Sequence, residues 1–461
     1  MSTIRAKPAR VTELEGQARA LESANRLEEA AAAYEAALTI DASSQVSAEG
    51  RARIALQLKE EGAVAHCARA LPFHDRQPDR QLRMIETAAA ELGRAAIPLV
   101  ESFVERHPGN TTANELLSEL RAGAGSDDEF LQHYHRALAA EPESKPLLLS
   151  YWSVLARAGR RLDALQSMES KRSLFAGDRD FLLLQADIAI HAGLPDRAGP
   201  ALDRLDEQPD ALLARAHHRL QTGHAGEAAE LLEQVISLEP GNQSAWALLE
   251  PAWRILGDNR HEWLVGQAGV LASQELELSS AQLAEIAGTL RTLHRSSTEP
   301  IGQSVRGGTQ TFGQLFTRRE PEILRLIETL AGAVRHYFEA LPPFDPRHPL
   351  LSHRNGQLVF GPSWSVRLTG GGFHSAHFHP NGVLSSACYI GLADDLGGAD
   401  QPGWLEIGRP PPELGLDLPP LAAFEPKPGR LVLFPSFLFH GTRPFTGGER
   451  LTVAFDVIDL G

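Results

Sequence analysis

The stretch PKPGRLVLFPSFLFHGTRPFTGGERLTVAFDV, residues 426–457, contains two short apolar runs separated by turns rich in Gly and Pro. RLVLFP (430–435) and RLTVAFDV (450–457) are typical of β-strands, and no helical period lies between them. Four similar runs precede this stretch: SWSVRL (363–368), FHSAHFH (373–379), LSSACYIGL (384–392) and GWLEIG (403–408). Short strands joined by turns, without intervening helices, predict a jelly roll or sandwich for residues 351–461 rather than a parallel sheet.

The composition changes along the chain in agreement with this prediction. Gly and Pro make up 29 of the 111 residues in 351–461, but 41 of the 350 residues before them. The upstream part is instead rich in Ala, Leu, Glu and Arg, which favour helix. A chain of 461 residues is also too long for one ordinary core. We therefore expect a multidomain α + β protein with its β domain at the C-terminal end.

The helical part repeats with a period near 34 residues. Helix-like segments end at an acidic residue or a proline, and these landmarks are separated by 67, 34, 67 and 31 residues: Asp41, Pro108, Pro142, Pro209 and Pro240. Such a period is typical of tetratricopeptide helix pairs, in which small residues allow two helices to approach closely. Six or seven units would fill residues 11–257, and we predict a tetratricopeptide-like α-solenoid there. Its groove suits a peptide or a partner helix, although such an array can also serve only for dimerisation, so the oligomeric state stays open.

Residues 258–350 are mixed in pattern. A helix start at Ser279 and Ser280 and the apolar period of residues 320–341 predict two helices. QSVRGGTQT (303–311) lies between them and is rich in Gly, Ser and Thr. We expect residues 258–350 to provide helical support and entrance loops for the C-terminal domain, with Arg306 either lining the entrance or standing in an ordinary turn.

Charge and cysteine content restrict the classes of function. The chain has 44 basic and 59 acidic residues and a net charge of −15, which argues against nonspecific binding to nucleic acid or to an anionic membrane. The N-terminal residues lack the apolar core of a signal peptide, and no stretch has the roughly 20 apolar residues of a membrane span. The two cysteines, Cys67 and Cys388, offer no disulfide framework. We expect a soluble, cytoplasmic protein.

Three histidines of the predicted β domain form a candidate metal site. His377 and His379 are two residues apart, so on an extended strand their imidazoles share one face while Phe378 faces the other way. His440 follows an apolar run and is expected at a strand end or turn. Three imidazoles suit a borderline divalent ion such as iron, zinc, nickel or copper. A His-X-His pair alone is weak evidence, because histidines beside Phe are commonly structural.

Several other polar or aromatic residues of this segment have less defined roles. His353 and His374 are interpreted as structural, and His374 is a further candidate for supporting the metal site or contacting substrate. The mouth of a jelly roll commonly holds a ligand. Three further residues are candidates for lining it, but their strand parity cannot be assigned: Trp364, Arg367 and Trp404.

The order of these features resembles the iron(II)- and 2-oxoglutarate-dependent oxygenases. His-X-His, a Tyr ten residues on, the GWLEIG strand, LFPSFLFHGTRPF and ERLTVAFDV occur in succession. More narrowly, the pattern resembles the oxygenase family that is often fused to tetratricopeptide repeats. The resemblance covers about residues 300–461 and implies a double-stranded β-helix catalytic core at 351–461.

The resemblance also implies roles for individual residues. His377 matches the first histidine of the family motif and His440 the distal one. Arg450 matches the arginine that pairs with the distal carboxylate of 2-oxoglutarate, and a guanidinium fork fits a carboxylate well. Thr452, two residues on, matches the hydroxyl of an Arg-X-Ser/Thr pair. Tyr389 matches a tyrosine that often contacts the same carboxylate, although an aromatic residue there could simply fill the core.

The second motif position departs from the usual triad of two histidines and one carboxylate, because it is His379. We favour ligation by His377, His379 and His440, which leaves the site one negative charge short, and the dianionic 2-oxoglutarate could supply that charge. The alternative is that only His377 and His440 ligate, with water or a halide in the third place. Asp394 and Asp395 follow the strand, but no spacing argument makes either of them a ligand.

The implied activity is that of a dioxygenase that uses Fe(II), 2-oxoglutarate and O2 and acts as a hydroxylase. Fusion to repeats favours a side chain of a peptide or protein as the substrate, bound by the repeat groove. Residues 351–461 carry a net charge of −3, so −12 lies upstream, which favours a basic or polar partner. Two alternatives stay open: a three-histidine cupin-type enzyme that does not use 2-oxoglutarate, and an inactive scaffold based on the repeats.

Overall fold

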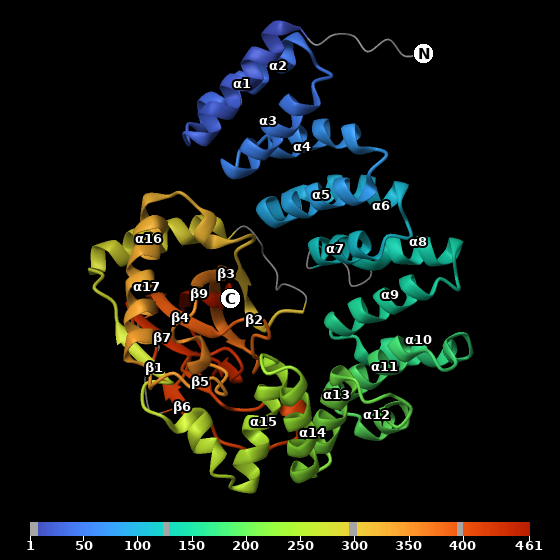
Figure 1. The fold of residues 1–461 in the computed structure, drawn as a ribbon, viewed down its shortest axis with the longest axis vertical. Helices are drawn as coiled ribbons and strands as arrows, with labels where there is room; N and C mark the ends of the chain where they lie inside the picture. The colour runs from blue at the N-terminus through green and yellow to red at the C-terminus, as the bar shows by residue number, and fades with distance from the viewer. Residues whose placement is uncertain (1–7, 123–128, 295–301, 394–399) are drawn as a thin grey trace. The chain divides into compact units, whose positions relative to one another are not determined.

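The computed structural model describes residues 8–122, 129–294, 302–393 and 400–461 (Figure 1). The chain divides into two compact units, residues 1–142 and 143–461, and each unit is described by itself. No helix among the described residues combines the length and the apolar character that crossing a bilayer requires. Cys67 and Cys388 are free and buried.

The first unit consists of helix pairs. Its described residues form α1 (Ala9–Ser23) with α2 (Leu27–Ile40), α3 (Gln45–Gln57) with α4 (Ala63–Ala70), α5 (Pro78–Leu92) with α6 (Ile97–Arg106), and α7 (Thr111–Arg121) with α8 (Gln132–Ala140). Small residues fill the contacts between the helices, as the sequence predicts: Ala18, Ala30 and Ala37 are fully buried. The aromatic side chain of Tyr34 is buried among them.

The second unit begins with three further helix pairs and a single helix. These are α9 (Lys145–Arg157) with α10 (Arg161–Ser170), α11 (Arg179–His191) with α12 (Pro195–Leu202), α13 (Pro209–Gln221) with α14 (Ala225–Leu238), and α15 (Gln243–Leu256). Over the described parts of both units, the first helices of successive pairs begin 30 to 36 residues apart. The predicted helical repeat is therefore confirmed.

The rest of the second unit contains two antiparallel sheets. The larger has the strand order β1-β7-β4-β9-β3-β2 and the smaller the order β6-β5-β8. The strands are β1 (Ala272–Glu275), β2 (Val305–Gln310), β3 (Leu358–His374), β4 (Leu384–Leu392), β5 (Leu405–Ile407), β6 (Ala422–Phe424), β7 (Arg430–Pro435), β8 (His440–Thr442) and β9 (Glu449–Asp459). This agrees with the antiparallel two-sheet domain predicted from the sequence, with β1 and β2 added from the segment before residue 351.

Helices cover the larger sheet on one face. The helices α16 (Ser280–Leu293) and α17 (Pro321–Ala340) share an apolar cluster with alternate residues of β4, β7 and β9 (Figure 1). A second cluster joins α13, α14 and α15 to β5, β7 and the segment after β7, through residues such as Trp246, Ile407 and Phe437. The last repeats and the sheets of this unit therefore share one apolar core.

Two local expectations were wrong. Residues 373–379 do not form one strand, because β3 ends at His374 and His377 makes only an isolated bridge with His440. Residues 303–311 are not an irregular loop, because Val305–Gln310 form β2, which pairs with β3 across a bulge between Arg306 and Gly308. Both errors concern pairing between distant segments, which short-range patterns do not report.

We expect Gly50→Ala to destabilise the first unit by about 1–3 kcal/mol, as overpacking does. A Cβ at Gly50, on α3, would overlap the Tyr34 ring. Urea unfolding followed by circular dichroism measures the change. Gly16→Ala is the matched control, because Gly16 lies inside α1 with open space around it, and alanine there should stabilise by about 0.5–1 kcal/mol. Equal effects of the two substitutions would contradict the packing argument.

Candidate active site

Strand β9 presents alternate residues to a cavity. Leu451, Val453 and Phe455 belong to the apolar cluster under α16 and α17. The residues between and beyond them line a cavity of about 810 Å³: Arg450, Thr452, Ala454 and Asp456. Since side chains alternate along a strand, one strand separates the apolar core from a polar site.

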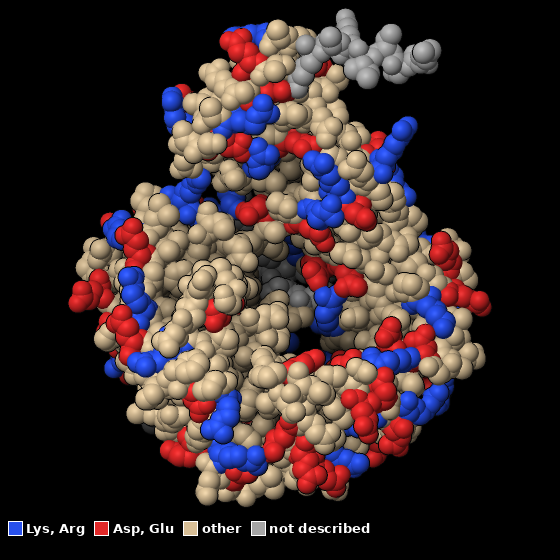
Figure 2. All heavy atoms as spheres, viewed as in Figure 1, with Lys and Arg blue, Asp and Glu red and all other residues tan. Residues whose placement is uncertain are grey.

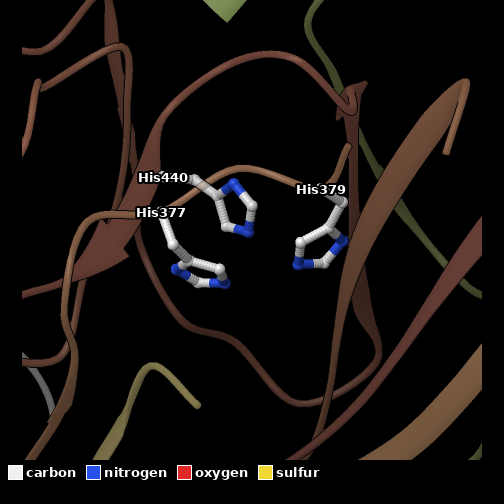
Figure 3. A group of neighbouring side chains, drawn as sticks. All are labelled: His377, His379 and His440. Carbon is white, nitrogen blue, oxygen red and sulfur yellow. The ribbon is translucent and has the colours of Figure 1, made fainter. Parts of the chain in front are cut away.

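Three histidines project into the same cavity. The backbones of His377 and His440 pair through two hydrogen bonds: the His377 N–H donates to the His440 carbonyl (3.0 Å) and the His440 N–H to the His377 carbonyl (2.8 Å). The His379 N–H donates to the Ser436 carbonyl (2.9 Å), which fixes the second histidine of the motif. One ring nitrogen from each histidine lies within 4.8 Å of the others (Figure 3).

The Nδ1 atom of each histidine already has an acceptor. His377 Nδ1–H donates to the Ser375 carbonyl (2.8 Å) and His440 Nδ1–H to the Leu438 carbonyl (3.0 Å). His379 Nδ1–H donates to Oδ1 of Asp456 (2.6 Å). Because these acceptors keep the proton on Nδ1, the lone pair of each ring stays on Nε2, available to a shared ion.

Burial keeps the imidazoles of His377 and His440 unprotonated. Burial, and then the nearby His379, lowers the pKa of His377 to about 3. Burial also lowers the pKa of His440 well below its ordinary value. Neutral imidazoles can ligate a borderline divalent ion, so the residues fit a transition metal.

Arg450 and Tyr389 lie buried together. Arg450 is 2% exposed, and its guanidinium carbon lies 5.0 Å from the centroid of the Tyr389 ring. Within the described parts of the chain, Arg450 Nε and the Tyr389 hydroxyl have no hydrogen-bond partner. A buried guanidinium without an acceptor is unfavourable, so this end of the cavity is suited to an anionic ligand. Thr452 is buried beside them and pairs in register with Tyr389.

Of the other candidate residues from the sequence, some line the cavity and some lie outside its lining. His374 lines the cavity, and its Nδ1 lies 3.0 Å from the Ser304 hydroxyl, which is 3.2 Å from Nε2 of His377. Trp364 also lines the cavity, whereas Arg367 pairs with Glu449.

His353 pairs with Asp459 outside the cavity lining. Trp404 does not line the cavity either. Asp394 and Asp395 lie outside the described residues.

Sequence reasoning missed several residues of the cavity. Asp456 could have been found, because it has the same strand parity as Arg450 and Thr452 and is an acidic residue in an apolar run. Ser304, Arg157 and Arg161 carry no comparable signal. Arg157 is the last residue of α9 and Arg161 the first of α10, more than 200 residues before the histidines, and only the fold brings them to the cavity.

Comparison with known families agrees with the observed architecture. Residues 362–456 match the family described as "Putative 2OG-Fe(II) oxygenase", and residues 3–46 match the tetratricopeptide repeat. The chain thus carries a C-terminal domain of the 2OG-Fe(II) oxygenase family and N-terminal tetratricopeptide repeats, as the sequence predicts. No curated protein matches the chain.

Solved structures resemble each part of the chain at low identity. A prolyl-4-hydroxylase from Pseudomonas putida is 16% identical over 43% of this chain and 98% of its own, with a TM-score of 0.29. HygX from Streptomyces hygroscopicus, with nickel and 2-oxoglutarate bound, is 14% identical over 44% and 87%, with a TM-score of 0.30. A tetratricopeptide repeat protein from Parabacteroides merdae is 15% identical over 53% and 99%, with a TM-score of 0.33.

We expect the metal-free protein to bind Co(II) at the three histidines, and His440→Ala to weaken this binding by more than about 100-fold. The reason is that a ligand is lost outright, whereas loss of an outer partner typically weakens binding 10- to 100-fold. Titration followed by the visible Co(II) absorption measures the affinity. His353→Ala is the control, because His353 pairs with Asp459 away from the cavity. Equal Co(II) affinity in His440→Ala and the wild type would exclude this site.

Proposed function

We propose that the protein is an iron(II)- and 2-oxoglutarate-dependent dioxygenase that hydroxylates a side chain of a peptide or protein. The observation that carries the proposal is one cavity that combines three converging imidazoles with a buried arginine lacking an acceptor. Membership of residues 362–456 in the 2OG-Fe(II) oxygenase family supports the same cofactors.

His377, His379 and His440 would hold the iron, and Arg450 would hold the cosubstrate. The guanidinium can form a bidentate pair with the distal carboxylate of 2-oxoglutarate, while the Tyr389 ring supports its face. Thr452, which lines the same wall, would donate its hydroxyl to that carboxylate. Iron(II), when bound with 2-oxoglutarate and O2, supplies the oxidising chemistry for hydroxylation.

The protein's own contribution is orientation and exclusion of water. Arg450, Thr452 and Tyr389 are nearly fully buried, so a carboxylate held there exchanges water for fixed donors. The Ser375 and Leu438 carbonyls and the Asp456 carboxylate fix the three rings before any ligand arrives. Such pre-organisation lowers the entropic cost of assembling the reacting groups.

The cavity leaves room for a substrate beside the cosubstrate. Its volume of about 810 Å³ is at the upper end of the range for small-molecule sites, roughly 300–1,000 Å³. One wall comes from the repeats, through Arg157 and Arg161, and another from β2, through Arg306. Residues of the repeat region therefore line the same cavity as the histidines, which supports a substrate presented by the repeats.

The charge of the cavity favours a substrate that carries an acidic group. Arg157, Arg161 and Arg306 line the cavity along with the buried Arg450. Among the described lining residues, the acidic ones are Glu413 and Asp456, and Asp456 is engaged by His379. The net charge of the chain suggested a basic partner, but the charges beside the reacting centre matter more for a bound group than distant, screened ones.

Anaerobic reconstitution with iron(II) and 2-oxoglutarate tests the activity itself. The dioxygenase should show the weak visible charge-transfer band of the iron–2-oxoglutarate chelate and form succinate when O2 is admitted. A cupin-type enzyme that does not use 2-oxoglutarate would bind metal without the band or succinate, and an inactive scaffold would show neither metal nor cosubstrate binding. Either result would overturn the proposal.

We expect Arg450→Met to lower the affinity for 2-oxoglutarate by about 100-fold, since a buried charged partner of the carboxylate is lost. Titration of the chelate band measures this affinity, and Co(II) binding should stay near the wild-type value. Arg347→Met is the control, because Arg347 is 84% exposed and does not line the cavity. Unchanged 2-oxoglutarate affinity in Arg450→Met would contradict the assigned carboxylate site.

We expect Arg161→Glu and Arg306→Glu each to reduce the turnover of acidic peptides by about tenfold, because like charges would then face each other. The assay compares two synthetic peptide pools of equal length, one rich in Glu and one rich in Lys, and measures the gain of one oxygen by mass spectrometry. Arg347→Glu is the matched control. Preference of the wild type for the Lys-rich pool would contradict an acidic substrate.

A further inference from the structure

The three Nδ1 acceptors of the histidine cluster differ in charge. His377 and His440 donate to neutral backbone carbonyls, whereas His379 donates to the carboxylate of Asp456 at 2.6 Å. His379 is also the position where an ordinary triad of two histidines and a carboxylate would have its acidic ligand. His379, which occupies the position of the usual acidic ligand, is thus the histidine of this cluster whose Nδ1–H donates to a carboxylate, that of Asp456.

Asp456 lies in a polar pocket that the fold builds around it. It is 6% exposed, and its Oδ1 accepts a second hydrogen bond from the Ser385 hydroxyl (2.7 Å). Ser385 lies 2.9 Å from the hydroxyl of Ser436, which is fully buried. Gly382 leaves the necessary space, because a Cβ there would overlap Ser436 and lie 3.4 Å from Asp456. The carboxylate therefore has a fixed orientation toward His379.

The charge of Asp456 lacks an ordinary counterion. Among the described residues, its ion-pair partner is His379, and neither Lys nor Arg pairs with it. A buried carboxylate without a cation is unfavourable, so this arrangement calls for a positive charge nearby. A divalent ion on Nε2 of His379 would supply that charge across the imidazole ring.

We propose that Asp456 is a positioning residue for the metal site. It keeps the proton of His379 on Nδ1, fixes the plane of the ring, and supplies through the imidazole the negative charge that three neutral ligands lack. The inference rests on the proposed function, because it assumes that His377, His379 and His440 bind a metal ion. It assigns His379 as a true ligand, in place of water or a halide.

The test measures Co(II) affinity of the full chain by anaerobic titration, which does not depend on turnover. Asp456→Asn keeps an acceptor oxygen of the same size but removes the charge, and it should weaken Co(II) binding 10- to 100-fold. Asp459→Asn is a matched control on the same strand, since Asp459 accepts a hydrogen bond from His353 at 2.8 Å. Its Co(II) affinity should stay within about twofold of the wild type.

A double-mutant cycle separates action through His379 from a general effect of charge. His379→Asp places a carboxylate in the ligand position, so Co(II) affinity remains measurable while the imidazole contact is gone. In that background, Asp456→Asn should change the affinity by less than about threefold. If Asp456→Asn changes the Co(II) affinity of the His379→Asp variant as much as it does in the protein that retains His379, Asp456 acts on the metal directly. This result would overturn the positioning role.

A spectroscopic signature gives a second readout. In the Co(II) protein, the Nδ1–H protons of the three ligand rings should give shifted, exchangeable NMR signals. Asp456→Asn should shift one of the three and accelerate its exchange, while leaving the signals of His377 and His440 in place. A uniform change of all three signals would indicate loss of packing instead, and would count against the proposal.

Further outcomes of these measurements separate failure of the inference from failure of the proposed function. If Asp456→Asn does not fold, Ser385→Ala, which removes the second hydrogen bond to Asp456 together with the 3.0 Å contact of the Ser385 hydroxyl with His379 Nδ1, should weaken Co(II) binding up to about tenfold. Wild-type Co(II) affinity in these variants would overturn the inference. If Co(II) binds but 2-oxoglutarate gives no chelate band, the proposed function fails while the role of Asp456 is still measured. A wild-type protein that binds no Co(II) would overturn both.

Discussion

Strand β9 packs one face against the apolar core and lines the cavity with the other, and the rest of the C-terminal fold depends on this constraint. It lies between β4 and β3, so its backbone is paired on both sides. One face packs under α16 and α17, and the other presents Arg450, Thr452 and Asp456 to the cavity. Because side chains alternate, a slip of one residue in register would bury these polar groups against leucines and expose Leu451 to the cavity. Register and site are thus specified by the same pairing.

The bridge between His377 and His440 is the second element that the site needs. Two reciprocal backbone hydrogen bonds hold segments that are 63 residues apart in sequence, and the ring centroids lie 4.2 Å apart. Gly441 permits this approach, because a Cβ there would lie 2.9 Å from the His374 carbonyl oxygen and 3.2 Å from the Ala376 nitrogen. Backbone carbonyls accept the Nδ1–H of these two rings, whereas a side chain, Asp456, accepts that of His379.

The sequence predicted what depends on local periodicity. The runs 384–392 and 430–435 coincide with β4 and β7, and Ser279 forms a capping box with Gln282 at the start of α16. These features follow from alternation and from capping chemistry within a few residues. The predicted parity of the histidine motif agrees only in part: His377 and His379 line the cavity, but Phe378 lines it as well while its ring packs on Phe439. Strict alternation is lost because the backbone there is not a regular strand.

Pairing over long distances could not be predicted in the same way. β2 is short and rich in glycine, and it forms a strand because β3 offers a free edge. Arg157 and Arg161 reach the cavity because α13, α14 and α15 share an apolar core with the sheets, which fixes the last repeats against the site. A repeat period predicts that helices stack, but it does not predict which surface the stack meets.

The cavity is lined by several arginines although the chain as a whole is acidic. The net charge of −15 is spread over a surface on which acidic and basic side chains are interspersed (Figure 2). Charges on such a surface are screened within about 8 Å at physiological ionic strength. Arg157, Arg161, Arg306 and Arg450 instead line one concave site with partly buried walls, where field lines concentrate and water screens less. An anionic cosubstrate and an acidic substrate group would therefore experience the local arginines rather than the average of the chain.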